Sequence, residues 1–181
     1  MPDTGQRGGQ FARRAVLFVA QGFGTGRAPY GPGTVGSLVG LVWFWALLWS
    51  ESFVVYVGLS LFAILGSVWL AEEAERILGQ HDPGSVVIDE IIAVPICFFV
   101  WMGASTLRYG TPMAPSDLLT GNNGLWVVVG FLLFRVFDIW KPWPCSASQK
   151  WPGGYGVTMD DVFAAMYVNI CFLLFLKLGW V

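Results

Sequence analysis

The chain has 181 residues, of which 55% are hydrophobic and 12% are charged, and its mean hydropathy is +0.62. A soluble domain carries about 25% charged residues, so this composition indicates a membrane protein, and the length allows one domain. The net charge of -2, without a long basic run, argues against nucleic acid as a partner. The three cysteines include no CxxC pair, which predicts reduced thiols and no disulfide framework.

Residues 1–10 are polar and rich in glycine, and we predict that they form a flexible tail before a single membrane-embedded domain of residues 11–181. Residues 11–20 combine Arg13 and Arg14 with a short apolar stretch, which favours an interfacial helix. About 20 apolar residues cross a bilayer core, and five runs approach that length: 34–49, 52–70, 86–103, 124–140 and 160–178. The sequence therefore predicts an all-α polytopic integral membrane helix bundle with about five spans.

Basic residues predict the orientation of these spans, because cytoplasmic loops carry an excess of lysine and arginine. With the N-terminus inside, the outer side holds only Arg108 and Lys177. The inner side holds Arg7, Arg13, Arg14, Arg27, Arg76, Lys141 and Lys150. Three acidic clusters then fall on the cytoplasmic side. Since the basic residues alone set this topology, the convergence of the acids independently supports one shared site there.

The first acidic cluster contains Asp82, Asp89 and Glu90, where the third apolar run begins. An ionisable group at that depth costs free energy unless it is compensated, which favours a functional site. The alternative is capping, because acids suit the start of a helix. Capping explains Asp82 well and Glu90 poorly. Adjacent helical residues point about 100° apart, so Asp89 and Glu90 can share a pocket only if it lies between several helices.

The second cluster, Arg135, Asp138 and Lys141, recurs every three residues at the end of the fourth run. Residues at that spacing share one helix face, so the three form a polar stripe. The alternative is an intrahelical ion pair with snorkelling cations. Because Arg135 lies more than a turn from the end of the run, we expect a buried anion beside it.

The third cluster, Asp160 and Asp161, follows a glycine-rich segment and opens the fifth run. Capping of the helix start is again the competing interpretation. The other carboxylates on the same side favour metal binding, with Asp89, Glu90, Asp160 and Asp161 as candidate ligands. Oxygen ligands without cysteine or histidine match Mg²⁺, which binds a few carboxylates together with substrate phosphate.

The glycine-rich segment 31–37 precedes the first run, with Arg27 just upstream. Glycines let a backbone approach a phosphate closely, and a helix start offers free N–H groups, so Arg27, Gly33 and Thr34 are candidate phosphate contacts. A simple turn with a threonine or serine cap is the alternative. The segment lacks the Lys-Ser/Thr ending of a P-loop.

Missing residues exclude several phosphatase chemistries. No cysteine has the arginine spacing of a thiolate phosphatase, and the single histidine, His81, cannot supply a histidine relay. Metal and carboxylate chemistry remains. A cation- or proton-coupled transporter could use the same carboxylates, but it would distribute acids through both leaflets. The outer side holds only Glu51 and Asp117.

The three clusters, in this order and between these runs, together with the Gly-Pro-Gly-Thr-Val-Gly-Ser segment, resemble the phosphatidylglycerophosphatase A family over about residues 22–166. The resemblance implies a bacterial inner-membrane phosphatase that uses Mg²⁺ to hydrolyse phosphatidylglycerophosphate in phospholipid biosynthesis. Two residues depart from the family pattern: Pro152, where some relatives have histidine, and Thr158, at an often apolar position. No role for that histidine carries over to this chain.

Within this hypothesis each candidate residue has a role. Arg135 and Lys141 would bind the phosphate, while Asp138 would orient Arg135 or bind the metal. Asp82 would be a general base or a ligand, and the residues leave open whether water or a carboxylate attacks. The partners expected are a membrane phospholipid and the bilayer. A homo-oligomer is possible, although small residues such as Gly36 and Gly40 fit internal packing equally well.

Overall fold

The computed structural model describes residues 4–181, with side chains described from residue 8 onward, and this part of the chain is helical without strands. The elements in chain order are α1 Thr4–Ala20, η1 Gly22–Arg27, α2 Pro32–Leu48, α3 Phe53–Leu78, α4 Ile88–Ile96, α5 Phe99–Tyr109, η2 Asp117–Leu119, α6 Asn123–Trp140, α7 Cys145–Ser148 and α8 Gly154–Lys177. The all-α prediction is confirmed.

Four helical segments are long and apolar enough to cross a membrane: Phe53–Leu78, Ile88–Tyr109, Asn123–Trp140 and Gly154–Lys177. The shorter helix α2 is also apolar, with 17 residues. The prediction of about five spans therefore agrees roughly with the structure. The expected third span consists of two helices: α4 ends at Ile96, one residue after Pro95, and α5 begins at Phe99.

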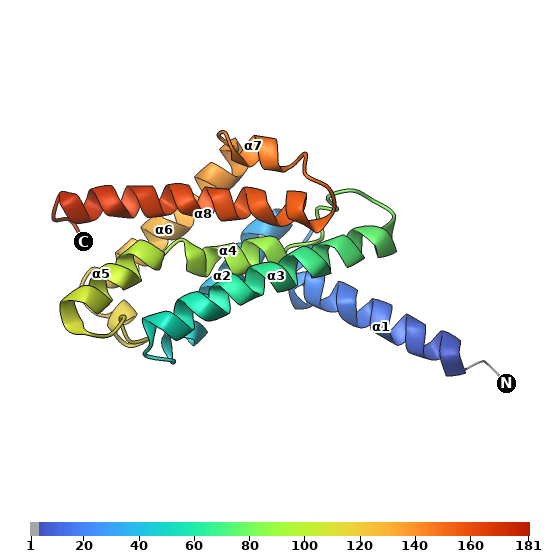
Figure 1. Cartoon of the computed structure of the whole chain (residues 1–181), viewed down its shortest axis with the longest axis horizontal. Coiled ribbons are helices and arrows are strands. Elements are labelled where there is room, and N and C mark those ends of the chain that lie inside the picture. The colour runs from blue at the N-terminus through green and yellow to red at the C-terminus, as the bar shows by residue number, and fades with distance from the viewer. Residues whose placement is uncertain (1–3) are drawn as a thin grey trace.

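Helix α1 projects from the bundle toward the N-terminus (Figure 1), and its residues 8–15 are exposed. It begins at Thr4, so residues 4–10, which we expected as a tail, are helical in the structure. Residues 1–3 lie outside the described part of the chain. The flexibility of the tail and the interfacial position of α1 stay predictions.

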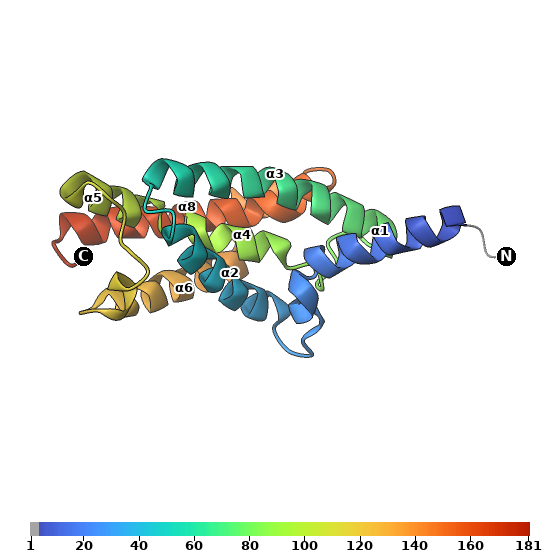
Figure 2. The ribbon, with the colours of Figure 1, turned by 90° about the horizontal axis from the view of Figure 1, so that it is seen from below.

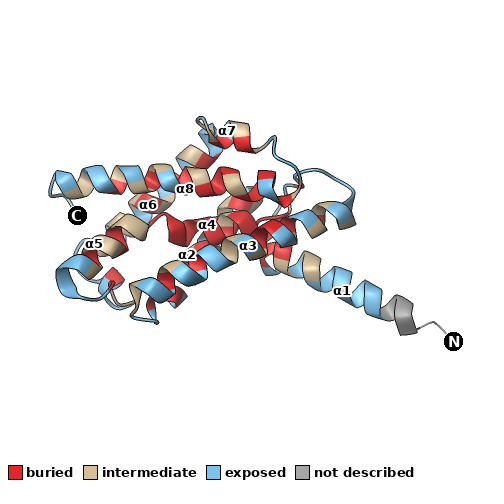
Figure 3. Ribbon diagram, in the orientation of Figure 1, coloured by how far each residue is buried: buried red, intermediate tan, exposed pale blue. Residues whose placement is uncertain are grey.

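Helix α4 lies at the centre of the bundle, where it contacts α2, α3 and α8 (Figures 1 and 2). Buried residues concentrate on α4 and on the faces turned toward it (Figure 3). The outer faces of α3 and α6 expose large apolar side chains such as Phe62, Leu65 and Leu132. Because the core is already formed inside, these exposed faces are suited to contact with lipid.

The segments that carry the acids gather toward one end of the bundle. The C-terminal part of α3, the start of α4 and the start of α8 lie at the end from which α1 emerges, and the C-terminus lies at the opposite end (Figure 1). Arg108 and Lys177, in the last turns of α5 and α8, belong to that opposite end. The fold therefore brings together the helix ends on which a shared site was predicted.

Candidate active site

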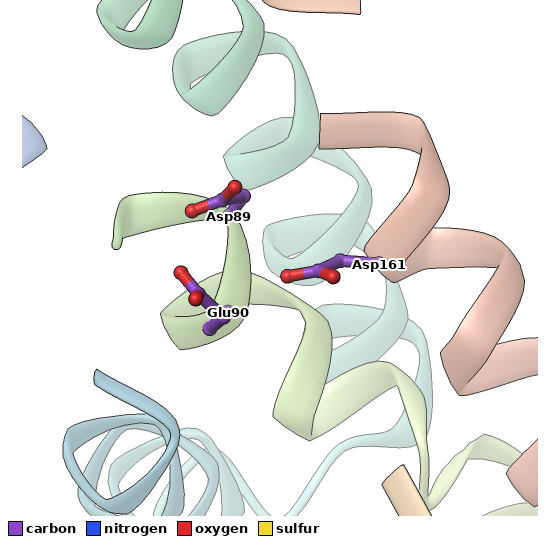
Figure 4. Close-up of side chains that lie close together, drawn as sticks. All are labelled: Asp89, Glu90 and Asp161. Carbon is purple, nitrogen blue, oxygen red and sulfur yellow. The ribbon is translucent and has the colours of Figure 1, made fainter. Parts of the chain in front are cut away.

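Three of the predicted metal ligands meet between α4 and α8. Asp89 and Glu90 lie in the first turn of α4, and Asp161 lies on α8 (Figure 4). One carboxylate oxygen from each side chain lies within 4.8 Å of the others. Asp89 and Asp161 are buried, and Glu90 is half-buried. We call these three residues the acid trio.

Several oxygens of the acid trio have no partner. Asp89 Oδ1, Glu90 Oε2 and Asp161 Oδ2 are buried and make no hydrogen bond within the described residues. Burying a charged group without compensation is costly, and neighbouring carboxylates repel each other. A divalent cation would satisfy these oxygens and offset the repulsion, and hard oxygen donors suit Mg²⁺. The donor set therefore fits the expected metal.

Glycines allow the helices to approach closely enough to form this cluster. A Cβ atom on Gly36 would lie 2.8 Å from Val87 Cβ, and one on Gly40 would lie 2.8 Å from the Ile91 carbonyl oxygen. On the other side, a Cβ atom on Gly154 would collide with the Val68 carbonyl of α3. The sequence thus packs α2 against α4, and α8 against α3, with backbones nearly in contact.

The polar stripe on α6 has the geometry that its spacing predicted. Arg135 Nη1 lies 2.6 Å from Asp138 Oδ2 and donates a hydrogen bond to Ser37 Oγ at 3.3 Å. Lys141, just after α6, lies 3.9 Å from Asp138 Oδ1. Asp138 therefore bridges the two cations. The Arg135–Asp138 contact is the intrahelical ion pair of the alternative interpretation, and the role of Asp138 in orienting Arg135 stays a prediction.

Asp160 neighbours the acid trio but is not a member of it. Its carboxylate accepts a hydrogen bond from Lys141 Nζ and forms an ion pair with it, whereas Asp161 faces Asp89 and Glu90. The sequence predicted both aspartates as metal ligands, and the structure brings only Asp161 into the acid trio. Both are also two turns inside α8, which begins at Gly154, so capping of the helix start does not explain them.

Lys141 is charged at neutral pH in this setting. Burial opposes its charged form, but the carboxylates of Asp160, Asp161 and Asp138 outweigh that effect and raise the pKa of Lys141 above its usual range. A positive charge is thus fixed at the edge of the acid trio. Together with the guanidinium of Arg135, it forms a cationic pair suited to an anionic group.

Helix α2 contributes to the same site through its first turns. A Cβ atom on Gly33 would collide with Glu90 Oε1 and would lie 3.4 Å from Arg135 Nη1. Ser37 donates to the Gly33 carbonyl at 2.8 Å and accepts from Arg135, a role that the sequence analysis missed. Its position one turn after Gly33 on the same face was the available signal. Thr34, in the same turn of α2, is half-buried.

Two predicted residues lie outside these contacts. Arg27 is exposed, and its Nε donates to Gln21 Oε1 at 2.9 Å, while Gln21 in turn donates to Ser85 Oγ at 3.1 Å. Asp82 is exposed with φ of 46°, and its backbone N–H donates to Glu75. The structure does not bring either Arg27 or Asp82 into the acid trio.

A helical membrane-type bundle with buried carboxylates beside an arginine and a lysine belongs to the class of proteins that can hold a metal ion and a phosphate together. Comparison with known protein families identifies which family of this class the chain belongs to. The family model described as phosphatidylglycerophosphatase A matches residues 18–176, and the chain belongs to this family. Membership confirms the resemblance seen in the motifs and makes the protein a hydrolase of phosphomonoesters, which argues against the transporter alternative.

Curated relatives match along most of the chain. Phosphatidylglycerophosphatase A of Escherichia coli strain K12 is 34% identical over 163 residues, which are 90% of this chain and 83% of the relative. The Haemophilus influenzae protein of the same name is 32% identical over 159 residues, 86% of this chain and 85% of that one. A putative phosphatidylinositol-3-phosphatase of Bacteroides thetaiotaomicron is 34% identical over 177 residues, 91% and 94% of the two chains. No solved structure matches.

Proposed function

We propose that this protein is a magnesium-dependent lipid phosphatase that hydrolyses phosphatidylglycerophosphate to phosphatidylglycerol and inorganic phosphate in phospholipid biosynthesis. The observation that carries the proposal is the acid trio, with its unpaired buried oxygens, beside Arg135 and Lys141. The names of the E. coli and H. influenzae relatives support the choice of lipid.

Asp89, Glu90 and Asp161 would hold the metal, because their oxygens already converge and lack other partners. When bound, Mg²⁺ would polarise a phosphoryl oxygen and make a nearby water more acidic. Asp160 would serve a different purpose, since it holds the Lys141 ammonium beside the trio. Carboxylates thus divide into metal ligands and groups that position cations.

Arg135 and Lys141 would bind the terminal phosphate of the lipid. The planar guanidinium of Arg135 suits two phosphate oxygens at once, and its ion pair with Asp138 fixes its orientation. Lys141 adds a second cation from the other side of Asp138. As negative charge develops on the phosphoryl oxygens during transfer, both cations stabilise it from fixed positions.

We place the protein in the bacterial cytoplasmic membrane with this site facing the cytoplasm. The apolar outer faces of α3 and α6 and the bias of basic residues toward one end of the bundle support this placement. The substrate could then present its headgroup at the helix ends while its acyl chains stay in the bilayer.

Phosphate release from phosphatidylglycerophosphate by the purified protein in detergent micelles tests the proposal. We expect activity with MgCl₂, loss of activity in EDTA, and recovery when Mg²⁺ is restored. A parallel assay with phosphatidylinositol 3-phosphate tests the substrate named for the Bacteroides relative. Full activity in metal-free buffer would refute the assignment of Mg²⁺ as the cofactor. A preference for phosphatidylinositol 3-phosphate would refute the assignment of phosphatidylglycerophosphate as the substrate.

A further inference from the structure

The break between α4 and α5 is occupied by a side chain from another helix. In a continuous helix, the Val100 N–H would donate to the Ile96 carbonyl. Here Val100 N–H donates to Asn169 Oδ1 on α8 at 2.9 Å, and Asn169 Nδ2 donates to the Ile96 carbonyl at 2.7 Å. The amide of Asn169 is therefore inserted into the hydrogen-bond ladder of the span, just after Pro95.

The side-chain amide of Asn169 is also hydrogen-bonded to its own helix, α8. Asn169 Nδ2 also donates to the Ala165 carbonyl at 2.9 Å, so the side chain has little freedom to follow a displaced partner. Backbone groups within an apolar span must find partners inside the protein. Any sliding of α8 along α4 would break both bonds to the ladder and leave the Val100 N–H and the Ile96 carbonyl unsatisfied.

This link lies close to the acid trio along both helices. Asn169 follows Asp161 by eight residues and Ile96 follows Glu90 by six, which correspond to about 12 Å and about 9 Å along a helix. The two helices that carry the trio are thus joined about two turns away from it. We propose that Asn169 is a positioning residue that sets the axial register of α8 against α4, and so the spacing of Asp161 from Asp89 and Glu90. This inference rests on the proposed role of the trio in binding Mg²⁺.

Tyr56 supplies a matched control at the same break. Its hydroxyl donates to the Pro95 carbonyl at 2.5 Å, but it comes from α3 and carries no link to α8. Tyr56→Phe and Asn169→Leu both remove side-chain hydrogen bonds at the same helix break. Only Asn169→Leu removes the connection between the two helices that hold the trio.

The test uses the purified full chain of each variant. The rise in melting temperature on adding MgCl₂ reports metal binding without catalysis, because a ligand that binds the native state stabilises it. We expect Asn169→Leu to lose most of this rise and to lower kcat by about 10²-fold, as for a small misplacement of reacting groups. The KM for the lipid should stay unchanged. Tyr56→Phe should lower the melting temperature in EDTA but keep the magnesium response and kcat.

Asn169→Ser keeps a small polar group that cannot span both backbone partners, and it replaces Asn169→Leu if the leucine variant does not purify. A normal magnesium response and normal kcat in the Asn169 variant would overturn the inference, and so would an equal loss in Tyr56→Phe. If the wild-type protein itself shows no magnesium response, the proposed metal role of the trio fails, and this inference fails with it.

Discussion

Replacing Asp161 with asparagine should stabilise the metal-free protein while it destroys activity. Asp161 faces two other carboxylates within 4.8 Å. Two unit charges at that separation repel by about 3.5 kcal/mol at an effective dielectric constant of about 20. Asparagine has almost the same shape, so it removes this repulsion without opening a cavity.

The full repulsion is an upper bound, because a metal-free trio can relieve it by taking up a proton. A net gain of about 1 kcal/mol would raise the melting temperature by about 2–4 °C in a chain of this size. The gain should appear only in EDTA. In MgCl₂ the wild-type protein gains stability from the ion that the variant binds poorly, so the order of the two melting temperatures should reverse.

The assay therefore measures thermal unfolding in EDTA and in MgCl₂, with phosphate release measured on the same samples. Asp161→Asn should lose about 10²-fold or more in kcat. Glu51→Gln is the control, because Glu51 is an exposed acid at the opposite end of the bundle, and it should be nearly silent in every measurement. An Asp161→Asn protein that is less stable in EDTA yet fully active would refute the metal site.

Three further outcomes follow from the same geometry. Gly33→Ala should fold, because the new methyl group displaces only the flexible end of an acidic side chain, but phosphate release should fall by about tenfold or more. Lys141→Ala should reduce kcat/KM for phosphate release by about 10²-fold, and an unchanged kcat/KM would exclude Lys141 from phosphate binding. In a background without native cysteines, cysteines at exposed Gln80 and Ser146 should resist an impermeant thiol reagent in intact cells, while one at Asn122 should react; the reverse pattern would invert the proposed topology.

The sequence predicted the apolar part of each span better than its ends. The second run was expected to end at residue 70, but α3 continues to Leu78. Its last two turns contain alanine and charged helix formers, and Arg76 pairs with Glu72 and Glu73 at the spacing that supports a helix. Hydropathy cannot detect such an extension, because these residues are polar although they are helical.

The predicted start of the last helix, at residue 160, was also wrong, because α8 begins at Gly154. Gly153, Gly154 and Gly156 indicated a loop that ends just before Asp160. Gly154 and Gly156 are helical where other chain segments pass too close for a side chain. This tertiary contact is invisible in the sequence. The rotation of α8 about its axis turns Asp161 toward Asp89 and Glu90, and Asp160 toward Lys141. The adjacency of the two aspartates in the sequence could not reveal this difference.

The glycines of α2 also change the interpretation of the segment that resembled a phosphate loop. Gly36 and Gly40 face α4 at distances that no side chain would tolerate, and Gly33 faces Glu90. Close packing of α2 against Glu90 and the rest of α4 therefore accounts for these glycines without a phosphate contact. Carboxylates that repel each other drift apart unless their helices are held rigidly, and tight interhelical packing through small residues provides that rigidity in an apolar span. The segment therefore supports the acid trio by holding α2 close to α4.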